Sequence, residues 1–303
     1  SRMAEVLNRV IEKAIRGSAP AQINVPRDYW TQVIDIELPP IVRFERQGGG
    51  KAAIEKASKM LSDAKFPVIL SGAGVVIGDA INECKVLAEK LDAPVCNGYQ
   101  HNDSFPGSHP LAVGPLGYNG SKAAMQLISK ADVVLALGTR LNPFSTLPGY
   151  GIDYWPKNAN IIQVDMNPDR IGLTKKVTVG IAGDAKQVAK QIFDKLSSNA
   201  GDSGREDRKN LIHQTKSAWL QTLTSLDHED DDPGTVWNKE ARDRDKDRMS
   251  PRQAWRAIQA AMPEDAIISS DIGNNCAIGN AYPTFEKPRK YFCLLYTSDA
   301  ADE

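Results

Sequence analysis

The sequence predicts an α/β protein organised around a doubly wound parallel sheet, and three observations lead to this prediction. The five residues 133–137 are all apolar and precede Gly-Thr-Arg140, which is typical of a central parallel strand buried on both faces. Similar segments at 67–71 and 161–165 come before and after it. Segments with helical spacing separate these strands over about 150 residues, as expected when helices cover both faces of a parallel sheet.

The first part of the chain predicts one helix and one short strand. Apolar residues recur at helical spacing from Val6 to Ala14, and Gly17 provides a C-terminal stop. Residues 21–25 alternate between apolar and polar side chains, as in a strand. One helix and one strand do not make a domain, so we expect residues 1–38 to be the C-terminal end of a truncated domain.

Helices and strands begin to alternate after a linker marked by Pro39-Pro40 and the glycines 48–50. We assign residues 41–200 to one Rossmann-like domain. Its helices are expected at 54–64, 81–91, 120–130 and 188–196, and its strands at 68–71, 93–96, 133–137, 161–165 and 177–181.

Residues 201–248 are rich in charges of both signs, so we interpret them as a charged linker that contains one helix. Leu211, Trp219 and Leu226 lie on one face of that helix at helical spacing.

A further domain is predicted to start at 249 and to be truncated at 293. Ser250-Pro-Arg-Gln253 has the capping-box pattern of a helix start, and residues 266–270 are typical of a buried strand. Asp271-Ile-Gly-Asn-Asn275 then forms the loop at the carboxyl end of this strand, where ligands of open α/β sheets bind. Such a loop approaches a phosphate or sugar closely, although a plain polar turn has the same composition. The pattern is lost after Cys293, so we expect 294–303 to be a non-native tail.

Composition excludes several classes of function. The chain has 303 residues, 41% hydrophobic and 25% charged, and no apolar run reaches the roughly 20 residues needed to cross a membrane. A net charge of −1 disfavours binding to nucleic acid or anionic lipid. The four cysteines and four histidines lack the spacing of metal sites, and unpaired cysteines are typical of a cytoplasmic protein.

Gly72-Ala-Gly74 follows a strand, as in dinucleotide-binding folds, but the rest of that fingerprint is missing. Its third glycine would stand at 77, where the chain has Ile77, and Asn97 stands where a ribose-binding carboxylate is expected. The pattern therefore disfavours nicotinamide binding and favours glycines that make a tight turn.

Together these segments resemble the thiamine-diphosphate-dependent enzymes of the acetohydroxyacid synthase type. Residues 22–30 look like the end of the family's pyrimidine-binding domain, 41–200 like its central domain and 249–293 like the start of its diphosphate-binding domain. The chain is thus expected to hold the central domain, flanked by incomplete pieces of two further α/β domains that bind thiamine diphosphate.

Within this family, the chain resembles the sulfoacetaldehyde acetyltransferase branch, through the segments 114–122, 137–156 and 227–234. The resemblance implies conversion of 2-sulfoacetaldehyde and phosphate into acetyl phosphate and sulfite, through acetyl-thiamine diphosphate. It implies thiamine diphosphate held by Mg²⁺, small-molecule substrates, and a homo-oligomer that is at least a dimer.

The resemblance also assigns the candidate site. It implies cofactor binding by Gly273, Asn274 and Asn275, supported by Asp271 and Ile272. The family's activating glutamate is expected upstream of Ser1 and its metal motif beyond Cys293. No catalytic or metal-binding residue is therefore assigned, and we expect the chain to be inactive alone.

Two alternatives remain open at this point. The chain could belong to another thiamine-dependent enzyme, such as one like acetolactate synthase, or act as a non-catalytic nucleotide-binding or oligomerisation module. Some relatives bind flavin at turns equivalent to 72–74, 138–140, Asp165 and 183–184. We expect a scaffold without flavin here, but the sequence leaves a retained nucleotide site open.

Overall fold

The structure is a computed structural model that describes residues 2–17, 19–33, 35, 40, 45–225, 251–271 and 273–293. The chain separates into two compact units, Ser1–Gln47 and Gly48–Glu303, which are described one at a time. The predictions made for Leu226, for the charged segment up to 248 and for the tail 294–303 lie outside the described residues.

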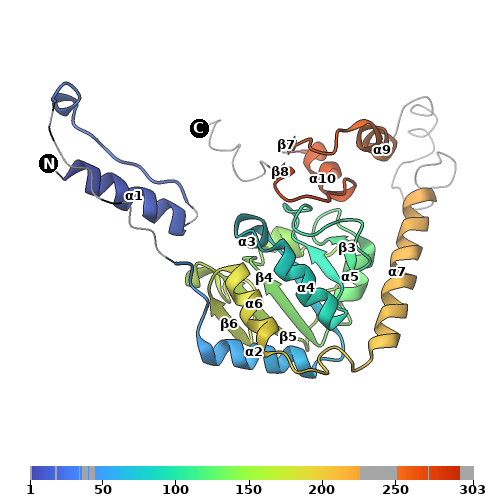
Figure 1. Cartoon of the computed structure of the whole chain (residues 1–303). Helices are drawn as coiled ribbons and strands as arrows, with labels where there is room; N and C mark the ends of the chain where they lie inside the picture. The colour runs from blue at the N-terminus through green and yellow to red at the C-terminus, as the bar shows by residue number, and fades with distance from the viewer. Residues whose placement is uncertain are drawn as a thin grey trace. The chain divides into compact units, whose positions relative to one another are not determined.

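The larger unit is built on a six-stranded parallel sheet with the order β3-β2-β1-β4-β5-β6 (Figure 1). Strand β4 (Val133–Leu137) lies at its centre, between β1 (Pro67–Ser71) and β5 (Asn160–Asp165). All residues of β1 and β4 are buried, because helices and loops cover both faces. This arrangement confirms the predicted α/β class and doubly wound parallel sheet.

The remaining strands complete the two halves of the sheet. Strands β2 (Val95–Asn97) and β3 (Ala112–Pro115) lie beyond β1, and β6 (Val179–Ala182) pairs with β5. Strand β3 was not predicted, because Gly114 and Pro115 interrupt its sequence pattern. Proline is tolerated there because β3 is an edge strand, where one side of the backbone needs no partner.

Helices α2 (Lys51–Asp63), α4 (Ile81–Leu91) and α6 (Ala185–Lys195) pack side by side over the sheet (Figure 1). Helix α5 (Lys122–Ile128) packs against β2 and β3. The short α3 (Ala73–Ile77), which the sequence did not predict, follows β1. Two 3₁₀ helices lie in the loops that flank β5: η2 (Pro143–Thr146) and η3 (Pro168–Arg170).

The expected helix of the linker is α7 (Arg205–Ser225), which packs against α5. The following segment contains α9 (Pro251–Ala261), β7 (Ile268–Ser270), α10 (Asn274–Ala281) and β8 (Tyr291–Cys293). Strands β7 and β8 are parallel, with Ile268 opposite Tyr291, and α10 connects them. The helix and strand predicted on either side of residue 265 are therefore present.

The smaller unit contains α1 (Met3–Gly17) and the 3₁₀ helix η1 (Arg27–Tyr29). The strand expected at 21–25 is not formed, because a strand needs a neighbour for its backbone hydrogen bonds and no described residue pairs with this segment. Over the described part of the chain, no helix combines the length and the apolar character needed to span a membrane.

Candidate functional site

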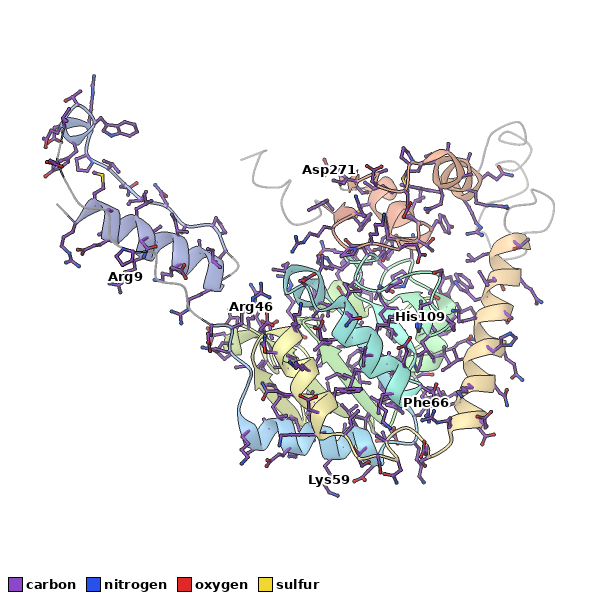
Figure 2. The ribbon with its side chains drawn as sticks, viewed as in Figure 1. Arg9, Arg46, Lys59, Phe66, His109 and Asp271 are labelled. Carbon is purple, nitrogen blue, oxygen red and sulfur yellow. The ribbon has the colours of Figure 1, made fainter. Side chains whose placement is uncertain are left out.

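The loop after β7 leads into α10 through a glycine with an unusual backbone. Gly273 has φ 99° and ψ −163°, a conformation that residues with a side chain rarely adopt. A Cβ atom placed on Gly273 would meet nothing within 4 Å, so the space beside this backbone is open. Asp271, two residues before Gly273, is exposed (Figure 2).

This geometry suits an anionic group. The first amides of a helix have no partner within the helix and lie at the positive end of its dipole, so phosphates bind there. Asn274 and Asn275 are the first two residues of α10, and glycine before them lets a phosphate approach the backbone closely. The side chains of both asparagines, and the whole of Ile272, lie outside what the structure describes, so their predicted roles stay predictions.

A second strand–glycine–helix turn, after β1, is closed by the protein itself. The Gly74 amide donates to the Gly138 carbonyl over 2.8 Å, and the Gly72 amide donates to Leu137 over 3.1 Å. A Cβ on Gly74 would lie 2.6 Å from the Cα of Gly138. The glycines are needed for this contact between two backbones, which is the tight turn that the sequence favoured.

The other turns considered for flavin also use their polar groups internally. The buried Asp165 carboxylate accepts the Asn167 amide over 2.8 Å, and Asp184 accepts two amides of α6. The side chain of Gln163 donates to the carbonyl of Thr139, the residue after Gly138. These contacts favour a scaffold at this edge of the sheet, and the expectation of no flavin stays a prediction.

Two residues near this edge have roles that the sequence did not indicate. Burial, together with the charge of Arg140, lowers the pKa of His101 to about 4, so its imidazole is neutral at pH 7 and offers a phosphate no charge. The Asn97 amide donates to the Ser104 hydroxyl over 3.0 Å and thereby orders the loop after β2. Asn97, the last residue of β2, thus has a structural role in holding this loop.

No metal site competes with the α10 loop among the residues that the structure describes. His, Cys, Asp and Glu side chains form no group of three or more there that could hold a metal ion. His109 pairs with Glu89, over 3.1 Å. The buried Cys84, Cys96 and Cys276 are free thiols.

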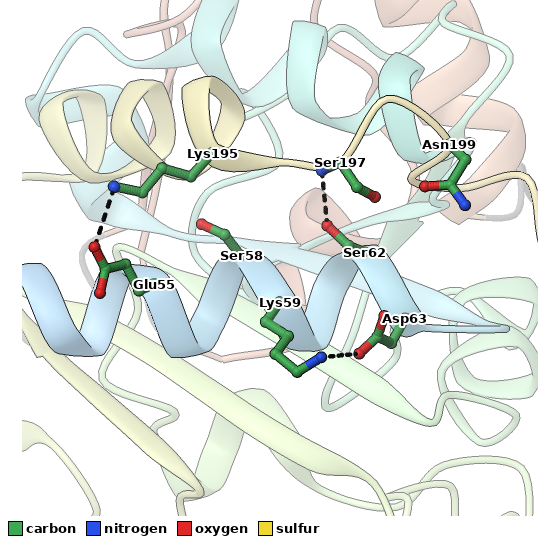
Figure 3. Close-up of a pocket in the computed structure, with 8 residues that line it drawn as sticks. All are labelled: Glu55, Ser58, Lys59, Ser62, Asp63, Lys195, Ser197 and Asn199. Atoms are coloured by element: carbon green, nitrogen blue, oxygen red, sulfur yellow. Dashed lines mark hydrogen bonds and ion pairs between the residues drawn. The ribbon is translucent and has the colours of Figure 1, made fainter.

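A surface hollow of about 450 Å³ lies between α2 and the end of α6 (Figure 3). Its charged groups pair with one another: Lys195 with Glu55 over 3.3 Å, and Lys59 with Asp63 over 3.2 Å. Because α6 returns from the carboxyl end of β6, this hollow lies toward the amino edge of the sheet, away from the edge where ligands bind.

Comparison with known proteins identifies the central domain. Residues 54–192 match the family model described as "Thiamine pyrophosphate enzyme, central domain". The structure also resembles that of benzoylformate decarboxylase from Polynucleobacter necessarius, with a TM-score of 0.68 and 17% identity, over 96% of this chain and 49% of the other. At this low identity the likeness bears on the fold alone.

The curated relatives are much more similar. A protein named "Probable sulfoacetaldehyde acetyltransferase" from Rhizobium meliloti (strain 1021) is 78% identical, over 96% of this chain and 49% of its own length. The sulfoacetaldehyde acetyltransferase of Roseovarius nubinhibens is 74% identical, over 96% and 48%.

A probable acetolactate synthase large subunit from Methanocaldococcus jannaschii is only 33% identical, over 73% and 36%. The chain spans about half the length of the curated relatives with which it shares the greatest identity. The parallel sheet, the match over 54–192 and these relatives together show that the chain belongs to the thiamine pyrophosphate enzyme family.

Proposed function

We propose that the chain forms part of a sulfoacetaldehyde acetyltransferase, which converts 2-sulfoacetaldehyde and phosphate into acetyl phosphate and sulfite. The observation that carries this proposal is the 78% identity, over 96% of the chain, to a relative with that name. The acetolactate synthase relative shares 33% identity, which makes that activity the weaker candidate.

The proposal gives each part of the chain a place in the enzyme. Residues 1–38 would end the pyrimidine-binding domain, 41–200 form the central domain, 201–248 the linker, and 249–293 begin the diphosphate-binding domain. The helix–strand–helix–strand order from α9 to β8 supports the last of these assignments, since it is the α/β pattern expected of that domain.

In this enzyme, the α10 loop would hold the diphosphate group of thiamine diphosphate, with Mg²⁺ as the counter-ion. The open space beside Gly273 and the start of α10 behind it fit a phosphate group, because the amino end of a helix and its dipole both favour an anion. When bound, the cofactor supplies the electron sink for cleavage of the carbon–sulfur bond. The chain's own part is to bind and orient it, with Asn274 and Asn275 as proposed donors and Asp271 and Ile272 in support.

Assembly is part of the same proposal. Enzymes of this family complete their active sites between two chains, so we infer a homo-oligomer that is at least a dimer. Light scattering of the protein at the length of its curated relatives would measure this, and a monomer that retains activity would contradict it.

The reaction itself is tested on the protein at that same length. With thiamine diphosphate and Mg²⁺ present, we expect sulfite release from sulfoacetaldehyde that depends on phosphate, together with equimolar acetyl phosphate. Formation of acetolactate from pyruvate, without sulfite release from sulfoacetaldehyde, would overturn the proposal in favour of the acetolactate synthase alternative.

A further inference from the structure

The loop between β2 and β3 touches the segment that carries the α10 loop, at residues far apart in the sequence. The Gly107 amide donates to the Phe285 carbonyl over 2.8 Å. Beside it, the Ser108 amide and hydroxyl both donate to the Glu286 carboxylate, over 2.9 and 2.7 Å. These contacts hold the central domain against the connection between α10 and β8.

In the same contact, the side chain of Asp103 accepts backbone amides at the start of β8, as a neighbouring strand would. One oxygen of its carboxylate accepts the amide of Lys290 over 3.0 Å and that of Tyr291 over 3.4 Å. Asp103 is only 2% exposed, and burial raises the pKa of its carboxyl group although these amides oppose the shift. A buried acceptor with two backbone donors costs much to remove, because both donors lose their partner.

Asn102, the neighbour of Asp103, holds the other end of α10. Its side-chain amide donates to the backbone carbonyl of Asn280, in the last turn of that helix. Asn280 is fully buried. The last carbonyls of a helix have no partner within the helix, so Asn102 acts as a cap supplied by the central domain.

The loop that carries these two residues is itself fixed to the sheet. The Ser104 hydroxyl donates to the Ser71 carbonyl over 3.1 Å, and the Ser71 hydroxyl donates to the Ser104 carbonyl over 3.0 Å. Asn97 adds its bond to Ser104, and all three residues are buried at the carboxyl ends of β1 and β2. Asp103 is therefore held on a rigid part of the central domain.

We propose that Asp103 and Asn102 are positioning residues, which fix β8 and the end of α10 to the central sheet and so hold Gly273 and the start of α10 in the conformation that receives a diphosphate. Both ends of the short helix are then determined: one by the Gly273 turn, the other by the central domain. The identity of the ligand rests on the function proposed above, whereas the mechanical coupling does not.

Hydrogen exchange, measured by mass spectrometry on the full chain, tests the coupling without any cofactor. Asp103→Ala should raise exchange in 268–281 and 290–293 by about tenfold, since the amides of Lys290 and Tyr291 lose their acceptor and the segment that they fix is released. Asp103→Asn keeps an acceptor oxygen in the same place and should stay within about threefold of the wild type. Unchanged protection of β4 and β5 shows that the variants are folded.

Ser108→Ala is the matched control, because it removes one exposed hydrogen bond of the same contact and should leave exchange unchanged. Wild-type exchange of 274–281 in Asp103→Ala would overturn the proposal. So would equal effects of Asp103→Ala and Asp103→Asn, because the acceptor oxygen would then be irrelevant.

A second measurement adds the ligand, using the protein at the length of its curated relatives. Asp103→Ala should weaken thiamine diphosphate binding by about tenfold while kcat at saturating cofactor changes by less than about threefold, as expected for a residue that positions the site and does not react. Equal losses in Ser108→Ala would overturn the positioning role. If the wild type binds no thiamine diphosphate, the proposed function fails, and the exchange experiment still decides the coupling.

Discussion

The turn after β1 and the turn after β7 both lead from a parallel strand through glycine into a helix, but their surroundings are opposite. At the first, Gly74 lies against Gly138, and its amide is taken by a carbonyl of the protein. At the second, Gly273 has a positive φ and open space where a side chain would be. The first turn uses glycine to bring two loops together, whereas the second leaves room for a ligand.

This difference teaches that a glycine-rich turn is not in itself a sign of a ligand site. The deciding observation is what a Cβ would meet: backbone in the closed turn, and nothing in the open turn. The variants below separate these two uses of glycine. At Gly138 both steric contact and backbone conformation oppose alanine, whereas at Gly273 backbone conformation alone opposes it.

The largest effect is expected for Gly138→Ala in the closed turn. Its Cβ would lie 2.7 Å from the Cα of Gly74, and its φ of 61° is also unfavourable for alanine. Overpacking and backbone strain together should lower the free energy of unfolding by about 4 kcal/mol. Urea denaturation measures this, with Gly151→Ala as the control, since Gly151 has a φ of 70° and nothing within 4 Å. Similar losses in both variants would show that the closed contact contributes nothing.

Arg208→Ala should have the next largest effect, because it removes an anchor of α7 on the same closed domain. Arg208 is 1% exposed, and its guanidinium donates only to backbone carbonyls in the bonds that the structure describes, including those of Leu91, Asp92 and Lys65. Losing these donors should cost about 3 kcal/mol. Arg208→Lys should recover only part of this, because an ammonium cannot match the planar set of donors. Lys209→Ala, at an exposed neighbouring residue, is the control. If Arg208→Ala lost less free energy of unfolding than this control, Arg208 would not anchor α7.

The parts predicted from the sequence are those determined by local pattern. The run 133–137 needs no partner to be recognised as a buried strand, and a parallel sheet covered by helices then follows from the alternation of strands and helices. The order of the strands does not follow from it and comes from the structure. Segment 21–25 shows the limit of this reasoning, because alternation alone does not supply the neighbouring strand that it needs. Strand β3, at the edge of the sheet, shows the opposite limit. It pairs with β2, but the glycine and proline in its sequence hide the strand pattern, so it was not predicted.

The candidate site was only partly accessible to the same reasoning. The loop Asp271–Asn275 could be proposed because it directly follows a predicted strand, and its role stays a prediction. Nothing in the sequence connects Asp103 with Lys290, which lies 187 positions later. Such a contact depends on how two elements pack in three dimensions, so no short sequence motif predicts it. The closing of Gly74 on Gly138 was hidden in the same way.

Gly273→Ala should have a smaller effect on stability and a larger effect on binding. No atom obstructs the new methyl group, so only the φ of 99° opposes it, at a cost of about 2 kcal/mol. Because a side chain would now occupy the open space, thiamine diphosphate binding should weaken by at least about tenfold in the protein at the length of its relatives. Gly172→Ala, with a φ of 74° in open space, is the control. Calorimetry that finds equal binding in both variants would remove Gly273 from the site.

The smallest effect concerns Asp165, whose carboxylate is buried at the edge of the sheet that carries the closed turn. Burial raises its pKa above the usual value for aspartate, although the Asn167 amide and the charges of Arg170 and Arg140 oppose the shift. A raised pKa means that the folded state favours the protonated form. The resulting stabilisation is complete below the unfolded pKa and is lost as pH rises through the folded pKa. On lowering the pH from 7 to 4, the wild type should therefore gain stability relative to Asp165→Asn, by about 1 kcal/mol. Urea denaturation at the two pH values measures the difference between the variants. A constant difference would mean that water reaches Asp165, and that this edge of the sheet is more open than the closed turn beside it implies.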